Sequence, residues 1–388
     1  MATMSRPGVR VKRLQDQTGL GYNSSVAIQT AGQIPAGRRV LAVKFSLLGD
    51  FTQPAAGAAL QSGESLRALI ATCVIGRRVN LSGLGLSALA FLKRGRHVQF
   101  PGDIPANVNE VHSRKVEWWI LYLDPTARSP NDGGIPAELW TDQIEVRLNS
   151  NAIFAVTAPT LGNATLRTEV YHDAAPHGPN KATLPISLQM VDQQFNTLDA
   201  VIQKAGLWKY AVLFTEAGLG VPNLITSANI SQLSSFIDGE PQLDALTMDD
   251  ACDWYNGMRA AGASRADSTA APTLQTVGES LSNQPGTTAA AGQGISTELV
   301  PLLIPPNPFN LNQLPRAASG FSARLAGTIG AYRIAYELVE ARNESQLGAG
   351  GRKLGIARGR AVAKLASKGG IPEGSDLALY TPTTLHGS

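Results

Sequence analysis

The segment "GLGLSA" at residues 83–88 is the first place in the sequence where residue types and spacing suggest a binding chemistry. It fits the pattern G-x-G-x-x-A and precedes a predicted short helix, as a dinucleotide-binding turn does. That chemistry requires a β-α-β unit around the turn, whereas the segments that follow are rich in predicted strands. We therefore expect the glycines to turn the chain into the helix and to bind no dinucleotide.

Two further groups of residues have types that occur in metal binding or catalysis. Asp249, Asp250 and Asp253 could form a metal cluster, but the dipole of a helix favours acidic residues in its first turn, which explains them more simply. His172 and His177 lie in a connection rich in Pro and Gly, where histidines are usually solvated. The five histidines show no H-x-H or H-E-x-x-H spacing, and the sequence has neither a P-loop nor a G-x-S-x-G turn. The sequence therefore predicts a protein that is not an enzyme and that uses no cofactor or metal.

The composition predicts a globular protein built from many short strands. The 388 residues are enough for two ordinary domains, and 43% of them are hydrophobic and 16% charged. The 39 glycines and 23 prolines are expected where many strands are joined by turns. No apolar run reaches the ~18 residues of a membrane-spanning helix, and the N-terminus lacks the apolar core of a secretion signal. We expect Cys73 and Cys252 to be free, buried thiols of a protein that folds inside a cell.

Basic residues are concentrated at the two ends of the chain. Residues 1–44 contain seven basic side chains and one acidic one, residues 346–388 contain six and two, and the rest of the chain is acidic. This distribution predicts that both ends contact an anionic partner, either nucleic acid or a lipid surface, although basic tails can also serve solubility alone. The residues that we expect to face this partner are Arg6, Arg10, Lys12, Arg13, Arg352, Lys353, Arg358, Arg360, Lys364 and Lys368.

The elements that must position these residues are mostly strands in the first half of the chain. In residues 141–150, Ile144, Val146 and Leu148 alternate with polar residues, as in a strand with one buried face. A short helix is predicted over 84–96. The other segments with strand patterns are 38–52, 65–79, 114–126 and 164–173. Short strands separated by turns of Gly, Pro, Asn and Asp favour a sandwich or jelly roll over an alternating α/β fold.

The second half repeats this order of elements after a predicted linking helix. Apolar residues recur at steps of three and four from Leu188 to Ile202, which predicts an amphipathic helix over 187–205. Strand patterns resume at 207–216, and the last of them is 331–342. The chain is therefore predicted to use one architecture twice, although the two halves share no convincing repeat at the level of residues.

The predicted organisation is two consecutive β domains with basic extensions. Residues 262–294 are poor in large apolar groups and rich in Ser, Thr, Ala and Gly, so we expect a long polar surface loop or a disordered stretch there. Thr247 and Asp250 have the spacing of a capping box and predict a second helix. The predicted divisions are a basic N-terminal arm, a first jelly roll, a second jelly roll and a basic C-terminal tail, at 1–39, 40–180, 181–345 and 346–388.

The segment "RKVEWWILYLDPT" at 114–126 predicts a strand that is apolar on both faces. One face carries Val116, Trp118, Ile120 and Tyr122, and the other carries Trp119, Leu121 and Leu123. Each Trp or Tyr buries ~150–250 Å², so leaving the second face in water would forfeit several kcal/mol at ~25 cal/mol/Å². We therefore expect Trp119, Leu121 and Leu123 to lie at a barrel-to-barrel or subunit interface. The alternative is that a helix of the same domain, for instance 86–94, covers them.

The order of these segments resembles the double jelly-roll major capsid proteins of lipid-containing, tectivirus-type bacteriophages, a lineage that includes the adenovirus hexon. The matching segments, within residues 40–345, are "VEWWILYLDP…GGIPAELWTDQIEVRLNS", "ATLRTEVYHD", "HDAAPHGPNKATLP", "LWKYAVLF" and "AYRIAYELVEAR". The likeness is one of pattern, and it includes the long polar excursion in the second domain. It implies a mainly β fold of two consecutive eight-stranded antiparallel jelly rolls with a few short helices.

The resemblance also implies a function in self-assembly. In that family three chains form a pseudo-hexameric capsomer of an icosahedral shell, long loops form outward towers, and the termini reach toward an internal membrane. Residues 262–294 would then form a tower, and the basic ends would face an anionic membrane or the viral genome. The implied partners are further copies of the chain in a homotrimer, together with penton and minor capsid proteins, and the implied location is the virion after assembly in the host cytoplasm. One departure is the N-terminus, where the family often has a helix and this chain has Arg6-Pro7-Gly8.

Two other functions stay open at the level of sequence. A receptor-binding or vertex spike protein of a phage is also β-rich and trimeric, but it is present in few copies and needs no basic tails. A jelly-roll carbohydrate-binding protein usually has an aromatic-lined groove with paired carboxylates, which we do not find in the sequence. The number of copies in purified material separates these functions from a shell protein.

Overall fold

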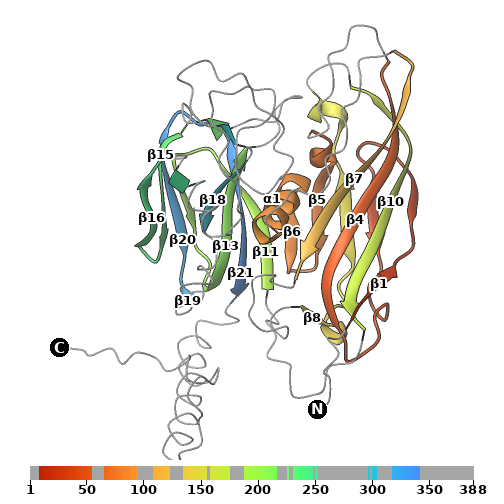
Figure 1. The fold of residues 1–388 in the computed structure, drawn as a ribbon, viewed down its shortest axis with the longest axis horizontal. Helices are drawn as coiled ribbons and strands as arrows, with labels where there is room; N and C mark the ends of the chain where they lie inside the picture. Colours follow the sequence, from red (N-terminus) through yellow and green to blue (C-terminus); the bar gives the residue numbers. More distant parts are fainter. Residues whose placement is uncertain are drawn as a thin grey trace, which may run out of the picture.

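Strands dominate the fold of the chain, as the sequence predicts. The part described by a computed structural model comprises residues 8–54, 65–94, 108–122, 134–154, 158–174, 188–215, 225–226, 230–247, 250–251, 296–297, 299–303 and 317–340. Within these ranges, none of the helices has the length and apolarity needed to cross a bilayer. Figure 1 shows the main sheets as successive layers, with α1 between the two halves of the molecule.

The first outer sheet is formed by strands of the first half of the chain. Its order is β1-β10-β4-β7, with β2 paired to β10 and β8 paired to β4. All of these pairings are antiparallel, and that of β4 with β7 runs from Ala42 opposite Leu121 to Thr52 opposite Val111. The strands are β1 (Val9–Arg13), β2 (Gln17–Leu20), β4 (Arg39–Thr52), β7 (Val111–Leu121), β8 (Ile135–Pro136) and β10 (Thr160–Asp173).

The central sheet joins the two halves of the chain. Strands β3, β9, β5 and β6 of the first half continue into β11, β21, β13 and β18 of the second. The junction is a short parallel pairing of β6 with β11, in which Val79 lies opposite Met190 and Asn80 opposite Val191. The strands are β3 (Ser25–Ile28), β5 (Ile70–Ile75), β6 (Val79–Leu81), β9 (Ile144–Leu148), β11 (Leu188–Phe195), β13 (Gly206–Thr215), β18 (Leu299–Leu303), β19 (Ala317–Ala318) and β21 (Tyr332–Glu340).

The second outer sheet lies on the side of the molecule opposite the first (Figure 1). Its order is β12-β20-β15-β16. Its strands are β12 (Asp199–Ile202), β15 (Ile230–Ile237), β16 (Glu240–Leu246) and β20 (Phe321–Gly327), and a separate pair is formed by β14 (Ile225–Thr226) and β17 (Ser296–Thr297). The helical segments whose bounds are described are α1 (Gly83–Arg94) and the 3-10 turns η1 (Ser65–Leu69), η2 (Ala137–Leu139) and η3 (Asn151–Ile153).

Two apolar cores follow from this layering. The first outer sheet and the first-half strands of the central sheet enclose one core, in which Phe45, Trp118 and Ile144 are fully buried. The second outer sheet and the second-half strands of the central sheet enclose the other core, which includes Leu233 and Phe321. Each half of the chain therefore forms a two-sheet barrel of its own, and the central sheet belongs to both.

Strands β13 and β21 are buried on both faces. Leu213 and Ile334 belong to the second core, whereas their neighbours Val212 and Ala335 belong to the first core, and all four side chains are fully buried. The first barrel and α1 therefore cover the face of β13 and β21 that the second barrel leaves open. Separating the two barrels would expose this apolar face to water, at a cost of ~25 cal/mol/Å².

A buried ion pair reinforces the joint between the barrels. Lys93, near the end of α1, pairs with Glu337 on β21, and these residues are only 2% and 1% exposed. Lys93 also donates to the backbone carbonyl of Leu121, and its Nζ lies 5.6 Å from the ring centre of Tyr210. Because a buried charge is stable only with partners, this pair fixes α1 against the second barrel.

Asp192 on β11 makes a second polar contact across the joint. Its Oδ2 accepts a hydrogen bond of 2.7 Å from the backbone N–H of Ser82, and its Oδ1 accepts one of 2.7 Å from Arg333. A Cβ at Gly85 would lie 2.4 Å from the same Oδ2. The glycine in the "GLGLSA" segment therefore allows a close approach between barrels, and the segment starts α1 as predicted.

The predicted linking helix over 187–205 is wrong, because these residues form β11 and β12. Strand β11 is apolar on both faces, since Leu188 and Met190 point into the first core while Val191 packs on the second. Alternation between apolar and polar residues is therefore lost in β11. The spacing that remains imitates the period of a helix.

The boundary of the predicted N-terminal arm, 1–39, also changes. From residue 8 onward this segment belongs to the first barrel, because β1, β2 and β3 all pair with barrel strands. Its first seven residues, the predicted loop at 262–294 and the tail at 346–388 lie outside the described residues. Cys73 is a free, buried thiol as predicted, and burial raises its pKa to about 12, while Cys252 is outside the described residues. The count of eight strands per roll stays a prediction.

Replacing Glu337 with alanine tests the joint between the barrels. The variant leaves the ammonium of Lys93 buried without its carboxylate, so we expect the free energy of unfolding to fall by about 3–5 kcal/mol in chemical denaturation. Asp199→Ala is a matched control, because it breaks an ion pair with Arg324 in which both side chains are mostly exposed, and it should have little effect. A loss for Glu337→Ala no larger than that of the control would contradict this account of the joint.

Candidate interaction surfaces

Among the described residues, the side chains that the sequence suggested for metal binding or catalysis hold the local fold together. The backbone N–H of Asp250 donates to Thr247 Oγ1 at 3.1 Å, and that of Thr247 donates to Asp250 Oδ2 at 3.2 Å, which is the predicted capping box. His172 is buried, and its Nδ1 lies 2.7 Å from the carbonyl oxygen of Asp173, which pairs with buried Arg39. Among the described residues, no three of His, Cys, Asp and Glu are grouped as a metal site requires. The surfaces are therefore the candidates for function.

The first outer face is the solvent-facing side of β1, β10, β4 and β7. Strand β7 turns Trp119 and Leu121 to this side, where both are half-buried, and turns its alternate residues into the first core. The ring of Trp119 packs on Tyr171, with 5.1 Å between centroids, and Lys44 Nζ lies 5.5 Å from the indole centre. Leu123, the third apolar residue predicted here, lies outside the described residues.

Among the described residues, helix α1 and the joint between the barrels lie on the side of β7 that faces away from Trp119. Helix α1 packs on the other side of β7, where a Cβ at Gly83 would lie 2.9 Å from Trp118 Nε1. The joint between the barrels uses Lys93 and Glu337 on that same side. Helix α1 therefore does not cover Trp119, and the placement of Trp119 at a barrel-to-barrel interface stays a prediction. Its position at a subunit interface stays a prediction.

Charged residues of both signs share the first outer face. Lys44 lies between Glu117 on β7 and Glu169 on β10, at 2.9 and 3.4 Å, and Lys115 also pairs with Glu117. Burial alone would lower the pKa of Lys44, but the hydrogen bond and charge of Glu117 outweigh it and raise that pKa. Burial alone would raise the pKa of Glu117, and its two lysine partners hold it below the ordinary value instead. The network therefore stays ionised at neutral pH.

Strand β1 is the exposed edge of this face. All five of its residues are exposed, and they include Val9 and Val11, which are 57% and 53% exposed. Of the basic residues predicted to meet an anionic partner, Arg13 forms an ion pair with Asp16. The other two on β1 are Arg10 and Lys12, whereas Arg6 and the six C-terminal ones lie outside the described residues.

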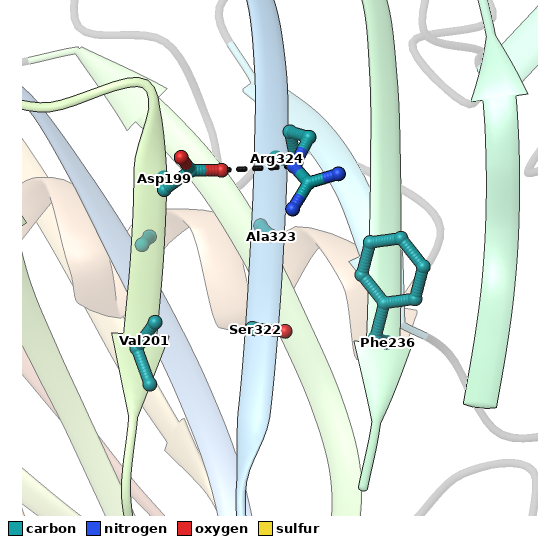
Figure 2. Close-up of a pocket in the computed structure, with 7 residues that line it drawn as sticks. Asp199, Val201, Phe236, Ser322, Ala323 and Arg324 are labelled. Atoms are coloured by element: carbon teal, nitrogen blue, oxygen red, sulfur yellow. Dashed lines mark hydrogen bonds and ion pairs between the residues drawn. The ribbon is translucent and has the colours of Figure 1, made fainter. Parts of the chain in front are cut away.

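The second outer face is the solvent-facing side of β12, β20 and β15. A shallow hollow of about 290 Å³ lies on it. Figure 2 shows Val201 and Phe236 on opposite sides of Ser322. Asp199 and Arg324 form an ion pair of 3.0 Å at the rim of the hollow. Val201 is 56% exposed on β12, the edge strand of this sheet.

Sequence reasoning missed the apolar residues of these edges and of this hollow. Val201 was part of the segment 187–205, for which a helix was predicted, so its outward direction on a strand could not be recognised. Val9 and Val11 alternate with Arg10 and Lys12, but only the charges of that segment were interpreted. The alternation is a strand signal that could have located β1.

Comparison with known proteins identifies the fold. No family model and no curated protein matches the sequence. The crystal structure of the STIV MCP matches with a TM-score of 0.53 at 13% identity, over 86% of this chain and 97% of that chain. The atomic structure of Sulfolobus Turreted Icosahedral Virus matches with a TM-score of 0.52 at 14% identity, over 88% of this chain and 93% of that chain. The crystal structure of the major capsid protein P2 from bacteriophage PM2 matches with a TM-score of 0.41 at 11% identity, over 87% of this chain and 99% of that chain. The chain therefore has the fold of the STIV MCP, with two jelly rolls side by side.

The carboxylate of Glu117 gives the first outer face a predictable response to pH. Because its pKa is lowered on folding, its stabilising effect is present above its ordinary value of 4.5 and is lost as the pH falls below that value. Glu117→Gln should therefore lower the free energy of unfolding by about 1 kcal/mol at pH 7 and by much less at pH 3. Urea denaturation at pH 7 and at pH 3 measures these changes in the free energy of unfolding, and Glu145→Gln, at an exposed residue, is the control. An equal loss at both values would contradict the assignment.

Proposed function

We propose that the chain is the major capsid protein of an icosahedral virus and that it acts by self-assembly rather than by catalysis. The observation that carries this proposal is the end-to-end match of both barrels, over 97% of the STIV MCP, in a chain whose two barrels share a buried joint. Because the order of the sequence segments resembles the capsid proteins of tectivirus-type bacteriophages, the proposed virus is a bacteriophage. The capsomer is a homotrimer, in which three chains supply six barrels.

The inner side of the shell is the end of the molecule from which both basic segments leave. The start of β1 and the end of β21 lie at the same end (Figure 1). Val9 pairs there with Asp173, and Glu340 pairs with Gly206. Both termini can therefore reach one anionic surface, and at ~1 kcal/mol per basic residue near such a surface many copies would bind it firmly. An internal membrane or the genome is the proposed partner.

The opposite end of the molecule is the proposed outside of the shell. Strand β13 runs from Gly206, which pairs with Glu340, to its far end, where Phe214 pairs with Leu299. Strand β18 therefore begins at the end remote from the termini, and the segment 262–294 precedes it in the sequence. That position favours an outward tower for this segment. Penton and minor capsid proteins are further proposed partners, with assembly in the host cytoplasm.

Size-exclusion chromatography with light scattering, followed by negative-stain microscopy, tests this function. The purified chain should behave as a trimer and, at higher concentration, form closed shells of uniform size. A chain that stays monomeric at all accessible concentrations would contradict the proposal. Few copies per particle would favour a vertex protein, and a monomer that binds sugars would favour a carbohydrate-binding protein.

Trp119→Ser separates assembly from folding. Trp119 is half-buried on the first outer face, so its loss should reduce particle yield strongly and lower the melting temperature only slightly. Trp208→Ser is the matched control, because Trp208 is 1% exposed in the second core and its truncation should cost about 3–5 kcal/mol of stability. Near-normal particle yield from Trp119→Ser would place Trp119 away from any subunit interface.

A further inference from the structure

We propose that the first barrel binds a divalent transition-metal ion, with Zn²⁺ as the representative, at its end remote from the chain ends. The three donor atoms are Nε2 of His112, Oε2 of Glu110 and Oε1 of Gln53. His112 is the second residue of β7, Glu110 directly precedes that strand, and Gln53 directly follows β4. The site has a structural use, and it does not depend on the proposed function.

The pairing of β4 with β7 brings these residues together. Phe51 lies opposite His112, and Gln53 is two residues beyond Phe51. The backbone N–H of Asn109 donates to the carbonyl oxygen of Gln53 at 2.9 Å, which holds Gln53 beside the turn that precedes β7. Side chains two residues apart on a strand share a face, so Gln53 lies on the inward face with Phe51. Gln53 and His112 are therefore diagonal neighbours, a spacing that long side chains can bridge.

Gln53 and His112 are buried with polar atoms that lack partners. Gln53 is 0% exposed, and neither its Oε1 nor its Nε2 has a hydrogen-bond partner within the part of the chain that the structure describes. No other described side chain has two such buried atoms. His112 is 7% exposed, and its Nε2 also lacks a hydrogen bond. Buried polar groups in native proteins are nearly always paired, so these atoms indicate a bound species between them.

The distance between His112 and Glu110 fits two ligands of one ion better than a direct hydrogen bond. Nε2 of His112 lies 3.6 Å from Oε2 of Glu110. A hydrogen bond from nitrogen to oxygen would need about 2.7–3.2 Å. Two donor atoms bound tetrahedrally to one Zn²⁺, each at about 2.0–2.2 Å from it, lie roughly 3.4 Å apart. The observed separation is therefore close to that of a chelating pair.

The donor types favour a transition metal over calcium or magnesium. Imidazole nitrogen is a preferred ligand of Zn²⁺ and Ni²⁺, whereas calcium and magnesium take oxygen ligands. The Glu110 side chain is 50% exposed, which gives the ion a route from solvent, while His112 and Gln53 form a buried inner wall. Water would complete the coordination on the exposed side.

The sequence gave no sign of this site, and its composition explains why. The expected metal patterns combine His, Cys, Asp and Glu, and no three of these are grouped among the described residues. In the proposed site only Glu110 and His112 are of these types, and the third donor is the amide of Gln53. That amide comes from a distant segment, which only the register of β4 with β7 places nearby.

A bound ion would fasten the start of β7 to the end of β4. This end of the barrel is the one where Thr52 pairs with Thr160, whereas the other end of β10 pairs with β1. An ion that binds only the folded chain stabilises the fold by mass action. Because the site needs no contact between subunits, the isolated chain is enough to test it.

Calorimetric titration of the chelator-treated chain with ZnCl₂ tests the site. One Zn²⁺ should bind per chain, and at a hundredfold excess over the Kd the melting temperature should rise by about 2 °C or more. Glu110→Gln removes the charged donor at a half-exposed position, so it should keep the metal-free melting temperature and weaken binding at least about tenfold. Glu145→Gln, at an exposed residue of β9, is the matched control and should bind as the unaltered chain does.

Gln53→Glu gives a result that a merely structural role would not produce. Without metal, the buried carboxylate should lower the melting temperature. With ZnCl₂, the added charged donor should bind at least about tenfold more tightly than the amide and restore the melting temperature. If the unaltered chain binds no Zn²⁺, or if Glu110→Gln binds it equally well, the site is wrong and the buried groups hold water only. Neither result changes the oligomeric state, which tests the proposed function separately.

Discussion

Strands β13 and β21 of the central sheet are buried on both faces, and the rest of the molecule depends on this constraint. On β13 and β21, adjacent side chains such as Leu213 and Val212 point into different cores, and both are fully buried. A sheet of this kind needs a cover on each side. The second outer sheet supplies one cover, while α1 and the first barrel supply the other. The two barrels therefore hold a fixed distance and angle.

A fixed pair of barrels is what the proposed shell would require of its building block. The polar contacts of Lys93 with Glu337 and of Asp192 with Ser82 define one alignment of the barrels, because any other alignment would leave these buried groups without partners. The same layering leaves two outer sheets facing away from each other, and it places the start of β1 and the end of β21 at the same end of the molecule (Figure 1). The proposed lateral contacts, inner side and outer side would thus follow from one arrangement.

The sequence allows the fold class to be predicted, because most strands have one buried face. The alternation of Ile144, Val146 and Leu148 appears in β9 as alternating buried and exposed residues. Prediction fails where a strand is buried on both faces. In β11 the loss of alternation imitates the period of a helix. In the strand at 114–126, the apolar second face is covered in part by Tyr171 of the neighbouring strand β10, and not by a second layer.

The candidate surfaces were harder to predict, because they depend on pairing between distant segments. Trp119 was recognisable as an apolar residue that points away from its own core, but its row with Val11 exists only through the register of β1, β10, β4 and β7. The hollow at Val201 likewise combines β12, β15 and β20. Electron cryomicroscopy of the purified assembly tests the central claim most directly. We predict closed rings of six barrels from three chains, with the same barrel-to-barrel angle in every chain. Barrels that vary in relative orientation from one chain to another would contradict the claim that the shared joint fixes them.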